Sequence, residues 1–188
     1  MVELLSRALS RIIAGLVFLS PAAHALIIHP SLPGEFPAIG IESHQPSSGS
    51  VARPEEELRQ GTALTRNGQF AEAIPHLVAA RGRVANEYAA KFNLAICYVA
   101  TGQPKLGIAI LSELRTGGDD NADVNNLLAQ AYVGDSRNQE AFEALKRAVS
   151  FTPANEKLYV FVADACMGKR AYALGMRVVD LGLKNLPQ

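Results

Sequence analysis

One spacing recurs through most of this chain. Between residues 54 and 187, similar side chains return every 34 positions, and no insertion breaks the register. Two columns hold small residues: Gly61, Ala95, Ala129 and Ala163, and Ala73, Gly107, Ala141 and Gly175. Two more columns hold mostly large apolar or aromatic residues: Leu64, Tyr98, Tyr132 and Cys166, and Leu77, Leu111, Leu145 and Val179. A fixed period of this length is typical of stacked units that cannot bury their apolar faces alone.

Within each unit the apolar residues follow a helical spacing. In the third unit, Leu128 and Tyr132 are four positions apart, and so are Ala141 and Leu145. The polar stretch 135–138 separates these two runs. Because i, i+4 neighbours share one face of a helix, each unit is predicted to be a helix, a tight turn and a second helix.

These columns resemble the tetratricopeptide repeat. The family pattern asks for Leu-Gly, an aromatic residue three positions on, then Ala, an aromatic residue or Leu, Ala, and a closing Pro. The third unit matches it best, with Leu128, Ala129, Tyr132, Ala141, Leu145, Ala148 and Pro153. The pattern is broken at Gln60, where the first unit lacks the usual Leu, and at Cys166, where the fourth lacks the aromatic residue.

The resemblance implies an all-α fold, an α-solenoid wound as a right-handed superhelix of about four units. The four repeats are expected at residues 54–87, 88–121, 122–155 and 156–188.

The N-terminal part has a different character. Arg7 and Arg11 precede a short apolar run, and small residues surround His24. This layout predicts a signal peptide at residues 1–25, because the apolar run is short for a membrane span. Residues 26–53, rich in Pro and Ser, are predicted to be a linker. The protein is thus expected to be an exported bacterial member of the family, periplasmic or secreted. The alternative is a membrane tether through an uncleaved N-terminal anchor.

Composition and motifs exclude several functions. The formal net charge is zero and no basic cluster is present, so nucleic-acid binding lacks an electrostatic basis. His29, His44 and His76 each lack a second ligand at metal spacing, and no nucleophile motif or phosphate-binding loop occurs. Neither an enzyme nor a cofactor or metal site is expected, and no membrane span is expected after removal of the leader.

The first helix of each repeat carries the candidate binding residues. In the family, these helices line a concave groove that holds a peptide or a partner protein. The predicted groove residues are Arg66, Phe92, Ile96, Asn126, Gln130, Lys157 and Asp164. Phe92 and Ile96 could equally pack on the neighbouring repeat.

Two functions follow from this reading. The first is a non-catalytic, exported module that binds a peptide or protein in the groove, as a scaffold. The second is a structural, accessory or truncated component of an envelope-assembly or secretion complex, which binds no free peptide. Apolar residues on the last predicted helix leave self-association through the C-terminal repeat open.

Overall fold

The computed structural model describes residues 53–187, so the predicted signal peptide (1–25) and all but the last residue of the predicted linker (26–53) lie outside the described residues. Eight helices, and no strand, occupy this part of the chain. They are α2 (Pro54–Arg66), α3 (Phe70–Ala80), α4 (Glu87–Ala100), α5 (Pro104–Thr116), α6 (Ala122–Gly134), α7 (Asn138–Phe151), α8 (Glu156–Gly168) and α9 (Tyr172–Asn185). The prediction of an all-α solenoid is confirmed.

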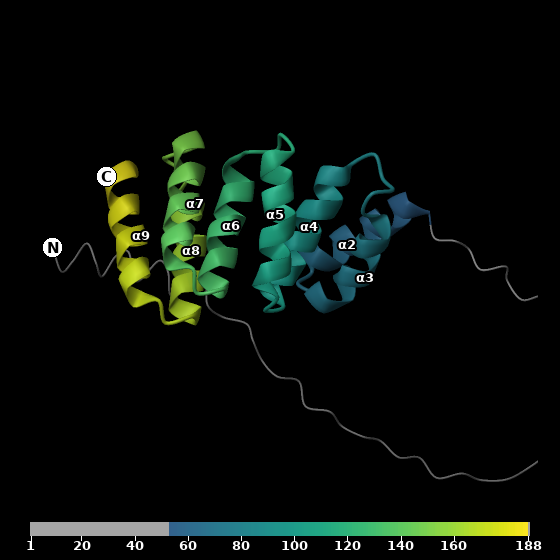
Figure 1. The fold of residues 1–188 in the computed structure, drawn as a ribbon, viewed down its shortest axis with the longest axis horizontal. Coiled ribbons are helices and arrows are strands. Elements are labelled where there is room, and N and C mark those ends of the chain that lie inside the picture. The colour runs from purple at the N-terminus through teal and green to yellow at the C-terminus, as the bar shows by residue number, and fades with distance from the viewer. Residues whose placement is uncertain (1–52, 188) are drawn as a thin grey trace, which may run out of the picture. The chain divides into compact units, whose positions relative to one another are not determined.

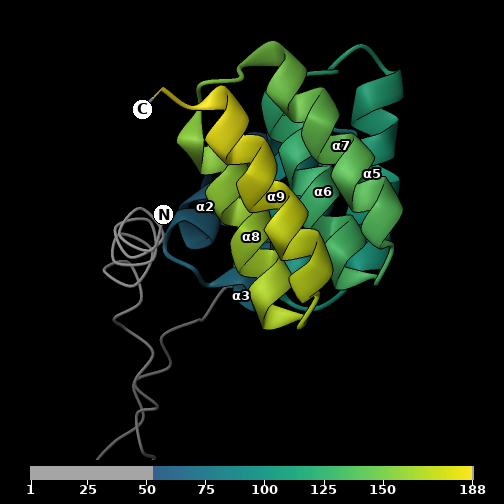
Figure 2. The ribbon, with the colours of Figure 1, turned by 90° about the vertical axis from the view of Figure 1, so that its left-hand side faces the viewer.

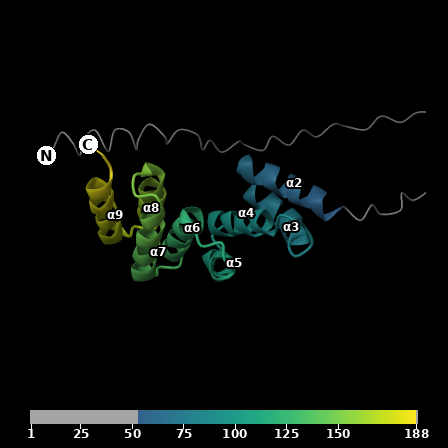
Figure 3. The same cartoon turned by 90° about the horizontal axis from the view of Figure 1, so that it is seen from above.

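The helices form two layers (Figure 1). Each expected repeat contributes a first helix, which is α2, α4, α6 or α8, and a second helix, which is α3, α5, α7 or α9. Seen from above in Figure 3, α2, α4, α6 and α8 lie along one side of a shallow arc, α3, α5 and α7 lie along the other, and α9 lies at the end of the array beside α8. The first helices therefore provide the inner surface of the array.

Asparagine side chains start three of the four first helices. Asn86 and Asn121 each accept a hydrogen bond from a backbone N–H three residues on, and Asn155 accepts one from the N–H of Lys157. An N-cap of this kind satisfies one of the amide groups that a helix start leaves unpaired. The first helix of the array, α2, instead begins with Pro54 at its first turn.

The turn inside each repeat has the same backbone geometry. One residue of each turn has positive φ, and these residues are Gly68, Gly102, Ser136 and Arg170, again 34 positions apart. One residue further on, a backbone N–H returns to a carbonyl five positions back, as from Gln69 to Leu64 at 2.9 Å and from Arg137 to Tyr132 at 2.8 Å. This bond closes the end of the first helix in the manner of a Schellman motif. The period of the sequence is thus also a period of the backbone.

The core follows the predicted columns through the first three repeats. Leu77, Leu111 and Leu145 are fully buried, and Ala95 and Ala129 are buried beside them. The small column has a steric reason, because a Cβ built on Gly61 would lie 2.6 Å from the Cγ of Leu77. A larger residue here would hold the two helices of the repeat apart.

The last repeat is stacked differently from the others. Of the two helices in the preceding repeat, α4 contacts α3 more than α2, and α6 contacts α5 more than α4, whereas α8 contacts α6 more than α7. In α9 the fully buried side chain is Val178, while Val179, which holds the position of the leucine column, is half-buried. The 34-residue spacing predicted the opposite for these two valines, because it assumed identical packing in every repeat.

Candidate partner-binding surface

The seven predicted groove residues differ widely in exposure. Three are exposed, namely Arg66, Lys157 and Asp164. Three are half-buried, namely Phe92, Ile96 and Gln130, and Asn126 is buried. All seven lie on the first helices α2, α4, α6 and α8.

Phe92 is engaged with its own helix. Its ring stacks on Tyr88, with centroids 5.5 Å apart and planes 9° from parallel, and it packs against the buried core. Stacking of this type holds the ring in place within the array. Phe92 thus has a packing role, and its remaining exposed edge is the part that a ligand could reach.

Asn126 does not face solvent. Its side chain is 4% exposed, and its Nδ2 donates to the backbone carbonyl of Leu158 in α8 at 2.7 Å. Its Oδ1 accepts a hydrogen bond from Nε2 of Gln130 at 2.9 Å. Asn126, which was predicted to line the groove, is instead covered by α8, and its amide joins α6 to α8.

Two exposed apolar residues on α8 were missed at the sequence level. Phe161 is 49% exposed and Met167 is 65% exposed, although both are large and apolar. They lie 34 positions after Leu127 and Val133 of α6, which are buried. The 34-residue period therefore predicts that Phe161 and Met167 are buried like their equivalents in α6, whereas the structure leaves both exposed.

Lys157, Phe161 and Asp164 form what we call the α8 cluster, and Met167 lies three positions beyond Asp164. Lys157, Phe161 and Asp164 are four and three positions apart, so they share one side of the helix. An exposed aromatic ring between an ammonium group and a carboxylate offers one apolar anchor and two polar contacts. This combination is frequent where proteins bind peptides or other proteins.

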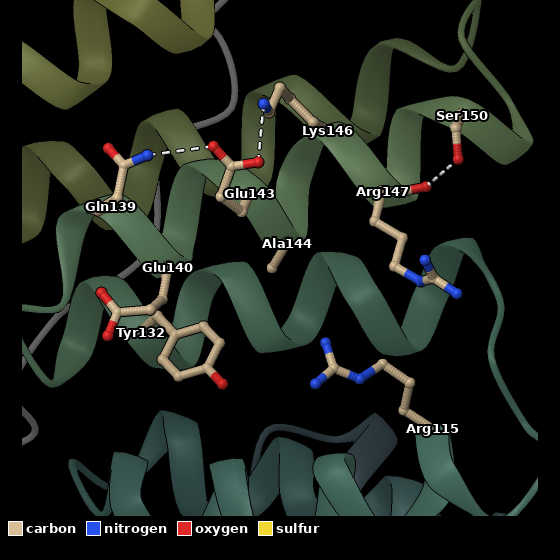
Figure 4. Close-up of a pocket in the computed structure, with 9 residues that line it drawn as sticks. All are labelled: Arg115, Tyr132, Gln139, Glu140, Glu143, Ala144, Lys146, Arg147 and Ser150. Carbon is tan, nitrogen blue, oxygen red and sulfur yellow. Dashed lines mark hydrogen bonds and ion pairs between the residues drawn. The ribbon is translucent and has the colours of Figure 1, made fainter.

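A shallow depression of about 620 Å³ lies on the opposite, second-helix side (Figure 4). It is lined by Arg115, Tyr132, Gln139, Glu140, Glu143, Ala144, Lys146, Arg147 and Ser150. Lys146 is paired with Glu143 at 2.7 Å, and Ser150 donates to the carbonyl of Arg147 at 2.7 Å. Among the described residues that line it, no hydroxyl is hydrogen-bonded to a general base, so the lining lacks the arrangement that nucleophilic catalysis requires.

An ion pair at its rim has a structural role. Arg147 of α7 binds Asp120, which lies in the turn before α6 and also accepts a hydrogen bond from Nδ2 of Asn125 at 2.7 Å. The Arg147 guanidinium, followed by the Asn125 amide, lowers the pKa of Asp120 to about 2. The carboxylate is thus ionised at neutral pH and ties the turn to α7.

The two cysteines are buried and free. Burial raises the pKa of the Cys97 thiol, and it raises that of Cys166 to about 11. The Cys97 sulfur is 3.2 Å from Oγ1 of Thr65 in the preceding repeat. Because the thiolate is the reactive form, both groups are inert packing residues at neutral pH.

Comparison with known proteins identifies the repeat. A family model described as tetratricopeptide repeat matches residues 64–131. This span runs through parts of three of the helix pairs described above and retains their 34-residue register. Residues 64–131 are therefore tetratricopeptide repeats.

Solved structures share the fold of this chain. MamA 41-end from Desulfovibrio magneticus RS-1 is 22% identical, with a TM-score of 0.55 over 70% of this chain and 76% of that one. The structures described as MamA AMB-1 and MamA MSR-1 are each 20% identical with TM-scores of 0.55, covering 70% of this chain and 72% and 76% of theirs. No curated protein sequence matches the chain.

The family has a functional consequence at a general level. Tetratricopeptide repeats are protein–protein interaction modules and are generally non-catalytic. A protein partner is therefore implied. None of the helices within residues 53–187 is both long enough and apolar enough to cross a bilayer.

Proposed function

We propose that this protein is an exported, non-catalytic scaffold that binds a peptide or a partner protein along its first helices. The α8 cluster carries the proposal. Phe161 and Met167 remain exposed on α8, one of the first helices, and so do Lys157 and Asp164. Exposed large apolar side chains on such a surface are typical of binding sites.

The other predicted groove residues extend this surface toward the N-terminal end. Ile96 and Gln130 are half-buried on α4 and α6, and Arg66 is exposed at the end of α2. The surface thus carries exposed apolar and charged side chains at α8 and one exposed basic side chain, Arg66, at the end of α2. We infer that the partner presents one apolar anchor, and an acidic group farther along for Arg66.

Truncating the anchor should weaken binding without unfolding the protein. Phe161→Ala should reduce the affinity about tenfold (~1.4 kcal/mol), because an aromatic ring at the centre of an interface contributes disproportionately. The measurement uses the full chain and peptides selected on it from a displayed random library, with Kd from fluorescence anisotropy and helicity from circular dichroism.

Leu106→Ala is the matched control for this variant. Leu106 is 47% exposed, close to the value for Phe161, but lies on α5 in the other layer. Its loss should leave Kd unchanged. Selected peptides that bind Phe161→Ala and Met167→Ala as tightly as the parent protein would contradict the proposed location of the site.

Export is a separate part of the proposal. It rests on Arg7, Arg11 and the apolar run that follows them. Fusing residues 1–30 to a reporter active only outside the cytoplasm should yield active reporter, and intact mass should place the new N-terminus at Leu26. An active reporter whose chain retains Met1 would favour the membrane-tethered alternative, and an inactive reporter would contradict export.

The structural or accessory role remains the second candidate. It is favoured by the apolar residues Tyr172, Met176 and Leu183, which are exposed on α9, a second helix. A component that only assembles with other proteins needs such a face and does not need a groove for free peptide.

A further inference from the structure

The depression on the second-helix side contains a cation that no carboxylate of the described chain binds. Arg115 is half-buried in its lining, and no ion pair to it occurs within residues 53–187. It lies in the last turn of α5, where its charge favours the helix dipole, but that effect leaves its N–H donors available. Arg115 therefore offers several donors to an acceptor from outside the described chain.

Asp120, the acidic side chain at the rim, is already fully engaged. Both of its oxygens accept from Nε of Arg147 at 3.0 Å, and Oδ1 also accepts from Nδ2 of Asn125 at 2.7 Å. A carboxylate that is bound in this way by one guanidinium and one amide has little capacity for a second guanidinium. Asp120 thus belongs to Arg147, and Arg115 acts on it only through its charge.

The carboxylates in the lining, and the one nearest to Arg115 in sequence, are also paired. The pairs are Glu140 with Arg137 at 3.0 Å, Glu143 with Lys146 at 2.7 Å, and Glu113 with Lys91 and Arg81, both at 2.7 Å. Each of these acids therefore has its own cation. The positive charge of Arg115 is left for an anion that another molecule brings.

A tyrosine hydroxyl group lies in the same lining. Tyr132 of α6 is only 9% exposed, and the guanidinium of Arg137 lies 4.6 Å from the centre of its ring, so the ring is held in place. Its hydroxyl group is not a buried group without a partner, so it reaches solvent at the depression. Figure 4 shows this hydroxyl pointing toward Arg115, and Arg147 extending toward the same part of the depression from α7.

A single carboxylate fits these donors. It can accept two parallel hydrogen bonds from the guanidinium of Arg115 and a third from the hydroxyl of Tyr132. Glu140 and Glu143 line the same depression, and their charges disfavour a group that carries two or more negative charges. A phosphate group is therefore a poorer match than a carboxylate.

The shape of the depression favours a carboxylate that a protein presents. Sites for free small molecules bury most of the ligand surface, which a shallow depression cannot do. A side chain that projects from a partner surface needs only its end to be covered. Figures 2 and 3 show α5 and α7 on the side of the array away from α8, so such a partner would not compete with one bound at the α8 cluster.

We propose that Arg115 and Tyr132 form a second binding site, which takes the carboxylate of a Glu or Asp side chain from an acidic peptide segment of a protein partner. Arg147 stays bound to Asp120 at the edge of the site. The inference does not rest on the proposed peptide site at α8, because it uses none of the residues of the α8 cluster.

Titration of the full chain with capped tripeptides, followed by NMR, tests the site. The probes are acetyl-Gly-Glu-Gly-amide and acetyl-Gly-Gln-Gly-amide, which differ only in the carboxylate. The Glu peptide should shift the Nε–Hε signal of Arg115 in a saturable way, with a Kd on the order of 10 mM, as is reasonable for one side-chain contact. The Gln peptide should bind at least about tenfold more weakly.

Arg83 provides the matched control signal. It is exposed in the turn between α3 and α4, has no ion pair within the described residues, and does not line the depression. Its Nε–Hε signal should move little and without saturation. Equal shifts at Arg83 and Arg115 would indicate general charge attraction and would overturn the proposal.

Two variants connect the shifts to the proposed donors. Arg115→Gln should abolish the response of the Tyr132 ring signals to the Glu peptide, and Tyr132→Phe should raise the Kd measured at Arg115 about threefold, because it removes only the hydroxyl group. Circular dichroism should show the helicity of the parent protein in both, since Arg115→Gln breaks no ion pair within the described chain and Tyr132→Phe keeps the buried ring.

Three further outcomes would overturn the proposal. The first is an Arg115 signal that the Glu peptide leaves unchanged up to about 50 mM. The second is a Tyr132 response that persists in Arg115→Gln. The third is inorganic phosphate that binds at Arg115 more tightly than the Glu peptide, which would identify a site for free phosphate instead of a protein carboxylate.

Discussion

Replacing Ala129 by leucine should destabilise the protein by about 3 kcal/mol, at the upper end of the cost of overpacking a core. Ala129 is completely buried on α6, in the small column that lets the two helices of a repeat approach each other. Three extra carbon atoms can be accommodated only if α6 and α7 separate. The free energy of unfolding of the full chain, from urea titration followed by circular dichroism, measures this loss.

Ala109→Leu serves as the control for this substitution. Ala109 is exposed in the middle of α5, so leucine there meets solvent, and Ala and Leu have similar helix propensities. The control should change the free energy of unfolding by less than about 0.5 kcal/mol. Equal losses in the two variants would show that the small column does not mark the helix contact.

Gly61→Ala should also destabilise the protein, by about 2 kcal/mol. Two effects oppose each other here. Alanine is favoured over glycine inside a helix by ~1 kcal/mol, but its Cβ would lie 2.6 Å from Cγ and 2.8 Å from Cδ2 of the buried Leu77. The steric effect dominates because Cγ is the branch point of a side chain that has no space to move into.

Gly175→Ala, in the equivalent column of second helices, should have the opposite sign. Its Cβ would lie 3.5 Å from Cβ of Cys166, which is an ordinary contact. The helix-propensity term then acts alone, and the variant should be more stable by ~0.5–1 kcal/mol. A thermal melt of the two variants beside the parent protein gives the comparison, and shifts in the same direction would contradict the steric argument.

The candidate site was only partly predictable. Helical spacing correctly placed Arg66, Lys157 and Asp164 on exposed parts of the first helices. It could not show that the amide of Asn126 is hydrogen-bonded to the carbonyl of Leu158, nor that Phe161 and Met167 stay exposed. Each of these facts depends on how α8 packs against α6. That packing is set by contacts between residues more than thirty positions apart in the sequence, such as Asn126 and Leu158.

Sequence alone determined the repeating part of this protein. The helix pairs, the buried leucines of the first three repeats and the closed turns follow from local spacing and from the 34-residue period, because each depends on residues within one unit. Tertiary structure alone decided how the fourth repeat joins the array. The period presumes that every unit packs on its predecessor in the same way, but α8 lies on α6, and α9 buries Val178 while Tyr172, Met176 and Leu183 stay exposed. Contacts between units are set by the fit of whole surfaces, which a column of similar residues does not specify.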